Sequence, residues 1–171
     1  MTELNIPFGG SGMVQECYRW ISDNIEEGKN ILEIGAGKVS TYHLSRKWNL
    51  YSIETDREWV NWYKEANYIY CSEKNEKEYM ECIQNQLPDN YDLLIIDGLL
   101  FNSRKKICEY HKMFKIKDIP VIVDDTWRES EAEIANWICE TYDKKVILIA
   151  TDPHGSQPTV NGVREQSRVL L

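Results

Sequence analysis

The stretch Asn30-Ile31-Leu32-Glu33-Ile34-Gly35-Ala36-Gly37-Lys38-Val39-Ser40 decides the fold of this chain. An apolar strand reaches the acidic residue Glu33, breaks into a turn that contains Gly35 and Gly37, and then enters a helix. A second acidic residue, Glu54, closes the next apolar strand. Glycines let the backbone turn sharply and let a ligand come close to it. In open α/β sheets such a turn lies at the carboxyl ends of the strands, so the stretch predicts a ligand site there.

Strand-like and helix-like segments alternate on both sides of this turn. Short apolar runs of this kind suit strands buried on both faces of a parallel sheet. No helical pattern separates the last two strands, so they are expected to pair antiparallel. The pattern predicts one α/β domain over residues 1–171, with a doubly wound, mostly parallel seven-stranded sheet that ends in an antiparallel hairpin. The expected strands are 30–34, 50–54, 67–71, 91–97, 119–124, 144–151 and 166–171, and the expected helices are 12–27, 39–48, 56–66, 74–86, 102–116 and 129–142.

Composition narrows the class of protein. The chain has 171 residues, 42% of them hydrophobic, and a formal net charge of −8. The acidic balance argues against a protein that grips duplex nucleic acid through its phosphates. No apolar run approaches the roughly 20 residues that span a bilayer, and the N-terminus lacks a signal-peptide pattern. We therefore expect a cytoplasmic protein that is not embedded in a membrane.

The cysteines and the basic residues each allow a plain interpretation. Five cysteines without a CxxC pair predict reduced thiols rather than a disulfide framework or a zinc site. Basic residues crowd the segment 104–117, which is interpreted as a solvated helix face, with a patch for an anionic substrate or partner as the alternative. The run 126–129 fits a capping box that opens the last helix.

The turn differs from a dinucleotide-binding turn in a way that bears on its ligand. A dinucleotide site needs G-x-G-x-x-G, with the pyrophosphate bound on free backbone amides. Here the third position is Ser40, and the carboxylate of Glu33 beside the turn would repel a pyrophosphate. Glu54, about 20 residues further on, is placed to accept hydrogen bonds from ribose hydroxyls. An acidic crevice favours a cationic, phosphate-free cofactor instead.

Four acidic strand ends, Glu33, Glu54, Asp97 and Asp124, follow one another in an order that resembles the class I S-adenosylmethionine-dependent methyltransferases. The resemblance covers nearly the whole chain from Asn30 on and departs at Val39, where many relatives have a third glycine. It implies S-adenosylmethionine as cofactor and a seven-stranded sheet with a terminal antiparallel hairpin. The cofactor-binding residues that it implies are Glu33, Gly35, Gly37, Glu54, Ser72 and Asp97.

The run Val123-Asp124-Asp125-Thr126-Trp127 looks like the metal-binding segment of the catechol- and caffeoyl-type O-methyltransferases. The resemblance implies a Mg²⁺ site formed by Asp97, Asp124 and Asp125, in which the metal orients a hydroxyl and lowers its pKa. Two positions depart from that pattern: Asp125 replaces an asparagine, and Leu100 replaces a lysine. The alternative is that Asp124 and Asp125 cap the helix and contact the cofactor.

Three residues are candidates for the catalytic base: Asp97, Asp124 and His154. His154 lies in the loop before the last strand, where a substrate would enter, and histidine is the usual base near neutral pH. Trp127 is expected at the mouth of the site, where it could stack on a planar substrate. The glycine-rich segment 1–11 is either a flexible terminus or a lid over the site. Arg104 is either a helix-surface residue or a guide for an anionic substrate.

The sequence thus predicts a single-domain methyltransferase that moves a methyl group from S-adenosylmethionine to a small molecule, most simply to an oxygen. Two alternatives stay open: a non-catalytic cofactor-binding partner subunit and an aminopropyl-type transferase. The acceptor, the metal dependence and the oligomeric state, a homodimer included, are not determined by the sequence.

Overall fold

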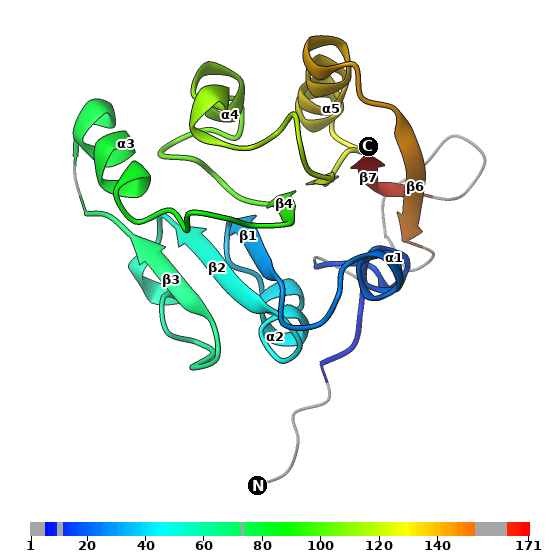
Figure 1. Cartoon of the computed structure of the whole chain (residues 1–171), viewed down its shortest axis with the longest axis horizontal. Coiled ribbons are helices and arrows are strands. Elements are labelled where there is room, and N and C mark those ends of the chain that lie inside the picture. The colour runs from blue at the N-terminus through cyan, green and yellow to red at the C-terminus, as the bar shows by residue number, and fades with distance from the viewer. Residues whose placement is uncertain (1–5, 10–11, 73, 153–163) are drawn as a thin grey trace, which may run out of the picture.

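The computed structural model describes residues 6–9, 12–72, 74–152 and 164–171, and the strands in this part form one sheet in the order β3-β2-β1-β4-β5-β7-β6 (Figure 1). The strands are β1 (Asn30–Ile34), β2 (Asn49–Glu54), β3 (Asn67–Tyr70), β4 (Leu93–Ile96), β5 (Val121–Asp124), β6 (Val146–Asp152) and β7 (Arg164–Leu170). The helices are α1 (Gln15–Asn24), α2 (Ser40–Leu44), α3 (Glu76–Gln84), α4 (Lys106–Glu109) and α5 (Glu129–Tyr142), with 3₁₀ turns η1 (Arg57–Trp59) and η2 (His111–Met113).

The sheet topology confirms the predicted fold class. Strands β1 to β5 pair in parallel, and β7 inserts between β5 and β6 with antiparallel pairing to both. Strand β1 has β2 on one side and β4 on the other, so the strand order reverses at β1. A reversal of this kind opens a crevice at the carboxyl ends of the strands, because the connections on its two sides leave in opposite directions.

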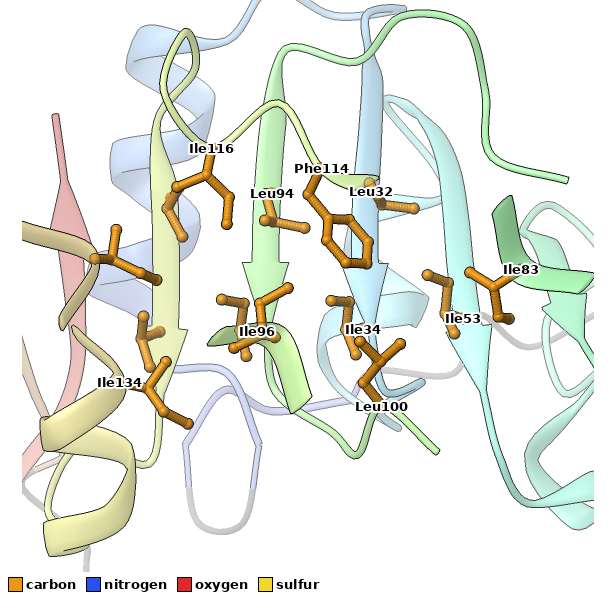
Figure 2. Close-up of a cluster of buried hydrophobic side chains, with 14 of the residues drawn as sticks. Leu32, Ile34, Ile53, Ile83, Leu94, Ile96, Leu100, Phe114, Ile116 and Ile134 are labelled. Carbon is orange, nitrogen blue, oxygen red and sulfur yellow. The ribbon is translucent and has the colours of Figure 1, made fainter. Parts of the chain in front are cut away.

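Helices cover both faces of the sheet, with α3, α4 and α5 on one face and α1 and α2 on the other (Figure 1). Side chains alternate along each strand, so Leu32 and Ile34 of β1 pack toward the first group and Ile31 toward the second. Figure 2 shows the first of these two cores, where Phe114 and Ile116 join the strand residues. Each fully buried side chain of this kind contributes about 1.5–3 kcal/mol of transfer free energy. None of the helices in the described part combines the length and the apolarity that a membrane crossing needs.

The prediction of a helix over 56–66 is wrong. The segment contains only the 3₁₀ turn η1, and the side chain of Asp56 caps it by accepting a hydrogen bond from the Glu58 N–H at 2.9 Å. Asn61 then takes a left-handed conformation with φ of 68°. A left-handed residue ends a right-handed helix, and asparagine adopts this conformation more readily than most residues.

The prediction of a long helix over 102–116 is also wrong. Only the short α4 and η2 form there, and Phe101 ahead of them has a left-handed φ of 64°. Ile107, Phe114 and Ile116 are all buried in the same core. Their spacing does not fit one helical face, so burying all of them requires the chain to leave the helix after α4.

The predicted helix 129–142 has the bounds of α5, but the predicted capping box is absent. Arg128 occupies the N-cap position and its side chain makes no capping hydrogen bond. The hydroxyl of Thr126 is buried and finds no hydrogen-bond partner among the described residues. Thr126 lies instead in the loop between β5 and α5. Its backbone N–H donates to the carbonyl of Gln166 in β7 at 2.9 Å, so pairing with the neighbouring strand sets the position of Thr126.

The prediction that all cysteines are reduced thiols is wrong for two of them. Cys71 and Cys82 form a disulfide, and Cys17, Cys108 and Cys139 are free. The bond links the chain just after β3 to α3, where the two Cα atoms lie 6.1 Å apart. Nothing in the local sequence signals this pairing, because it depends on how α3 folds back on the sheet.

Candidate functional site

A cavity of about 410 Å³ opens at the carboxyl ends of β1, β2, β4 and β5. The glycine turn forms its floor, and the loops after β2 and β4 form its sides. This is the position at which open α/β sheets bind their ligands. Residues on its wall are Gly12, Gly35, Ala36, Gly37, Lys38, Val39, Glu54, Thr55, Asp56, Trp59, Asp97, Gly98, Leu99, Arg104 and Asp125.

Gly35 and Gly98 make the close backbone approach that shapes this cavity. Gly35 has a φ of 91°, and a Cβ atom added to it would lie 2.2 Å from the Cα of Gly98. The N–H of Gly35 donates to the carbonyl of Ile53 at 2.8 Å, and that of Gly98 to the carbonyl of Ile34 at 2.6 Å. Only glycine fits at both positions, because a side chain at either one would push the loops after β1 and β4 apart.

The next two N–H groups of the turn are bonded to side chains of the protein itself. The N–H of Ala36 donates to Glu54 Oε2 at 2.9 Å, and the N–H of Gly37 donates to Thr41 Oγ1 at 2.8 Å. The hydroxyl of Thr41 in turn donates to Glu33 Oε2 at 2.7 Å. A pyrophosphate needs free N–H groups at such a turn, so this arrangement does not fit a dinucleotide.

Glu33 lies beneath the turn and not on the cavity wall. Its side chain is fully buried, with Oε2 accepting from Ser52 and Thr41 and Oε1 without a partner among the described residues. Burial raises the pKa of Glu33 to about 7, although the neighbouring hydroxyls oppose this shift. The structure therefore gives Glu33 the task of holding the turn, whereas the sequence predicts direct contact with the cofactor.

Glu54 lies on the wall and is held in one orientation. Its Oε2 accepts from Ala36, and its Oε1 accepts from the N–H groups of Thr55 at 2.6 Å and Asp56 at 2.8 Å. All three donors are uncharged backbone N–H groups, so none of them forms an ion pair with the carboxylate. A carboxylate held in this way can accept further hydrogen bonds from the hydroxyls of a ribose.

Asp97 reaches the cavity, whereas Asp124 does not. A Cβ atom added to Gly37 would lie 3.5 Å from Asp97 Oδ2, which places this carboxylate beside the turn. Burial raises the pKa of Asp97 well above its usual range, and the nearby Asp124 adds to the shift. Asp124 is buried behind the wall, where its Oδ1 accepts from Ser167 and from Gln166. Burial raises the pKa of Asp124 as well.

Asp125 also lies on the wall, in a left-handed conformation with φ of 57°. Its Oδ1 accepts from Trp127 Nε1 at 3.1 Å and from Gln166 Nε2 at 3.0 Å. Its Oδ2 lies 3.0 Å from Arg104 Nη2 and 3.2 Å from Arg128 Nη1. Burial by itself would raise the pKa of Asp125, but the Trp127 N–H and the two guanidinium groups outweigh it and lower the pKa.

The predicted metal site does not assemble. Asp97 and Asp125 approach the cavity, but Arg104 lies between them and Asp124 is turned toward Ser167. In the part of the chain that the structure describes, no group of three acidic, histidine or cysteine side chains could hold a metal ion. The donor set therefore does not fit the magnesium that the sequence predicts.

Other predicted residues lie elsewhere. Ser72 is exposed and does not lie on the wall, and His154 lies outside the described residues. Trp127, 37% exposed, contributes its N–H to Asp125, while its role toward a substrate stays a prediction. Of the segment 1–11, Phe8 stacks on His43 with ring centroids 4.1 Å apart, which places it against α2.

Sequence reasoning missed two wall residues, Trp59 and Lys38. Trp59 falls within the segment 56–66, which the sequence predicts to be a helix and which contains only the turn η1. Trp59 stacks on Trp62 with centroids 4.5 Å apart, and Lys38 Nζ lies 5.0 Å from the ring of Trp62. A signal for the position of Trp59 is present in the sequence. The N-cap Asp56 comes two residues after Glu54 at the end of β2, so the turn that Asp56 begins starts at the edge of the sheet where the cavity opens.

Comparison with known proteins adds to this geometry. No protein-family model matches the chain, and no curated protein matches it. Among solved structures, the MycE methyltransferase from the mycinamycin biosynthetic pathway, in complex with Mg, SAH and mycinamycin VI, superimposes with a TM-score of 0.55 at 12% identity over 95% of this chain. The chain spans 50% of the MycE chain in this alignment.

A functionally unknown protein from Deinococcus radiodurans R1 superimposes with a TM-score of 0.52 at 11% identity, over 91% of this chain and 85% of that one. At such identities a structural likeness reports the fold and not the activity. Together with the strand order and the glycine turn, these similarities establish that the chain has the Rossmann-like fold of the class I S-adenosylmethionine-dependent methyltransferases.

Proposed function

We propose that the protein binds S-adenosylmethionine in the cavity at the glycine turn and transfers its methyl group to a small molecule. One observation supports this proposal most strongly: the first three N–H groups of the turn are bonded within the protein. Those of Gly35, Ala36 and Gly37 donate to the carbonyl of Ile53 and to the side chains of Glu54 and Thr41, respectively. A turn whose first three N–H groups are bonded in this way suits a cofactor that has no phosphate. The carboxylates of Glu54, Asp56 and Asp97 on the wall suit a cofactor that carries positive charge.

Different residues of the cavity wall contact different parts of the cofactor in this proposal. Glu54 holds the ribose hydroxyls, because its carboxylate is fixed by three backbone donors and faces the cavity. Trp59 and Lys38 line the same side and enclose the cofactor next to Glu54. When bound, S-adenosylmethionine supplies an electrophilic methyl group on a sulfonium sulfur. The protein contributes mainly by orienting the acceptor for in-line attack.

A second cavity of about 230 Å³ is our proposed acceptor site. It shares Leu99 and Arg104 with the first cavity and continues to Ser130 and Glu131 at the start of α5. Its wall includes the polar side chains of Asn102, Ser103 and Ser130, which favours a small hydroxylated acceptor and thus O-methylation. The MycE structure contains a small-molecule compound, mycinamycin VI, and this is compatible with an acceptor of that general class.

Asp97 is our candidate for the base. Among the three predicted candidates, it is the one described residue on the wall, since Asp124 is buried behind it. Its raised pKa lets the carboxylate take a proton from an acceptor hydroxyl more readily than an ordinary aspartate. The hydroxyl oxygen would form the bond to the methyl carbon as the bond from that carbon to the sulfonium sulfur breaks. The electron pair of the broken bond would stay on the sulfur of S-adenosylhomocysteine, and the hydroxyl proton would move to Asp97. The cytoplasmic location, the homodimer and the roles of Ser72 and His154 remain predictions.

Calorimetric titration with S-adenosylhomocysteine and with NAD tests the binding step. We expect the wild type to bind S-adenosylhomocysteine and not NAD. Glu54→Gln should weaken this binding about tenfold or more, since a hydrogen bond to a charged group is worth about 1.5–3 kcal/mol. The exposed Glu58→Gln is the matched control and should bind like the wild type.

Methyl transfer is tested separately with labelled cofactor and a panel of hydroxylated and amine acceptors. Product with a hydroxylated acceptor supports O-methylation, and product with amines alone argues against it. Binding without any product would favour the non-catalytic partner subunit. Tight binding of NAD with no binding of S-adenosylhomocysteine would refute the proposed function.

A further inference from the structure

The guanidinium of Arg104 occupies the position at which the sequence predicts a metal ion. Arg104 Nη2 lies 3.0 Å from Asp125 Oδ2 and 3.8 Å from Asp97 Oδ1. On its other side, Nη1 lies 3.8 Å from Glu131 Oε1 and donates to the carbonyl of Asp124 at 3.4 Å. The guanidinium of Arg104 thus contacts groups at the carboxyl ends of β4 and β5 and at the start of α5.

This arrangement is sheltered from water. The side chain of Arg104 is 12% exposed, and its partners Asp97, Asp125 and Glu131 are 19%, 14% and 8% exposed. The neighbouring Lys105–Glu133 pair is more than half exposed on both sides, at 57% and 56%. Exposed pairs contribute little and are screened by salt, whereas sheltered charges are held in place more firmly. Arg104 is therefore a built-in part of the site and not a surface residue.

The carboxylate oxygens of Asp125 beside Arg104 are already engaged. Both oxygens of Asp125 accept from side chains, Oδ1 from Trp127 and Gln166 and Oδ2 from Arg104 and Arg128. A divalent ion would have to displace the guanidinium to reach them. Its positive charge would also lie close to that of Arg104, and like charges repel strongly where the dielectric is low.

The location of Arg104 connects the two cavities. Its side chain lies on the wall of the cofactor cavity and on the wall of the smaller cavity beside α5. A cation at this wall can attract and orient the oxygen of an acceptor as it approaches the methyl group. In metal-dependent enzymes a divalent ion performs that task.

We propose that Arg104 is a positioning residue that takes the place of a divalent cation, so that the acceptor oxygen is oriented by a guanidinium and the reaction requires no added metal. This inference rests on the proposed function. It assigns to Arg104 a role that neither the fold nor the comparisons supply. It also predicts that removing the guanidinium lets Asp97, Asp125 and Glu131, which do not form a metal-binding group as they stand, turn toward one another and bind a metal ion.

Terbium luminescence tests this inference in the intact protein. Trp127 Nε1 lies 3.1 Å from Asp125 Oδ1, so a Tb³⁺ ion bound at Asp125 would be excited through the indole. We expect no sensitised emission from the wild type. Arg104→Ala should gain emission, with an affinity for Tb³⁺ at least tenfold above that of the wild type, and Mg²⁺ should compete for the site.

Two further variants make the result specific. Arg104→Lys keeps a positive charge and should behave like the wild type. In Arg104→Ala combined with Asp125→Asn, the gained emission should disappear. Circular dichroism verifies that each variant is folded. Activity, once an acceptor is found, should be unchanged by EDTA in the wild type and should become stimulated by Mg²⁺ in Arg104→Ala.

The outcomes separate this inference from the proposed function. Emission from the wild type that Mg²⁺ displaces, or a folded Arg104→Ala that gains no Tb³⁺ binding, overturns the role of Arg104. If Arg104→Ala does not fold, the emission of the wild type alone tests whether Arg104 excludes a metal ion from the site. Loss of activity in EDTA also overturns the inference. Failure to bind S-adenosylhomocysteine overturns the proposed function instead, since the terbium readout does not depend on the cofactor.

Discussion

The two halves of the crevice hold their carboxylates in different ways. At the ends of β1 and β2, Glu33 and Glu54 accept hydrogen bonds from hydroxyls and backbone N–H groups, none of which is charged. At the ends of β4 and β5, Asp97 and Asp125 face the guanidinium of Arg104. Uncharged donors satisfy a carboxylate without cancelling its charge, whereas a guanidinium cancels it. The carboxylates of the first half therefore have no cation among their described hydrogen-bond donors, whereas those of the second half share the guanidinium of Arg104.

The same contrast appears in the titration of individual groups. Burial raises the pKa of Glu33 to about 7, because hydroxyl donors offset only part of the desolvation. For Asp125, the Trp127 N–H, Arg104 and Arg128 outweigh the desolvation and lower the pKa. Burial alone therefore does not decide the direction of a pKa shift, because the hydrogen-bond donors and the nearby charges act on it as well.

The largest expected effect comes from breaking the contact that joins the two halves. Gly35→Ala would place a Cβ atom 2.2 Å from the Cα of Gly98 at a φ of 91°. We expect a loss of about 3 kcal/mol or more in the free energy of unfolding, combining left-handed strain of about 1–2 kcal/mol with overpacking of about 1–3 kcal/mol. Urea denaturation measures this loss.

Gly28→Ala is the matched control for that substitution. Gly28 has a similar φ of 83°, but a Cβ atom there would meet nothing within 4 Å. We expect it to lose only the strain of about 1–2 kcal/mol. Equal losses for the two variants would show that the approach of the loops after β1 and β4 does not matter for stability.

A smaller effect on the free energy of unfolding is expected from the titration of Glu33 in the first half. The pKa of Glu33 is about 7 in the folded state and 4.5 as its ordinary value, so the folded state binds the proton more tightly. The contribution of Glu33 to stability should therefore fall by about 3 kcal/mol as the pH rises from about 4.5 to about 7, and Glu33→Gln should remove this part of the pH dependence.

Urea denaturation of the wild type and of Glu33→Gln at pH 5 and pH 8 measures the difference. The exposed Glu26→Gln serves as control and should retain the slope of the wild type. If Glu33→Gln also retains that slope, the buried carboxylate does not titrate as described.

The smallest effect on stability is expected in the second half, at the ends of β4 and β5. Asp125→Asn removes the charge that faces Arg104 and Arg128, and asparagine tolerates the left-handed conformation at this position. We expect a loss of about 1 kcal/mol at pH 7, because these pairs are partly shielded from water.

The sign of the pH dependence is opposite to that of Glu33. The pKa of Asp125 is lowered in the folded state, so its stabilisation is present above the ordinary value of 3.8 and is lost as the pH falls below it. The loss caused by Asp125→Asn should therefore be smaller at a pH below 3.8 than at pH 7, as urea denaturation at two pH values would show. A loss that persists at low pH would mean that shape and not charge matters at this position.

Prediction from the sequence succeeded where the signal is local and periodic. The strand at 30–34 and the helix at 129–142 were predicted with the bounds that the structure has, because an apolar run or an apolar stripe reports burial directly. Prediction failed over 56–66 and 102–116, where tertiary burial of individual side chains overrides a weak helical pattern.

The candidate site shows the same division. Glu33, Glu54, Asp97, Asp124 and Asp125 were all recognised as acidic strand ends. Only the structure distinguishes Glu33 and Asp124, which support the wall from behind, from the other three, which lie on it. Adjacent residues at a strand end can point in opposite directions, and the neighbouring elements decide which one reaches the ligand.

The sequence by itself determined the alternating strands and helices, the glycine turn and the acidic character of the crevice, because these properties depend on neighbours along the chain. The tertiary structure alone decided that Arg104 enters the crevice, that Thr41 and Glu54 take the N–H groups of the turn, and that Cys71 pairs with Cys82. These contacts join residues whose separation in space is set by packing of the whole domain, and no local pattern encodes it.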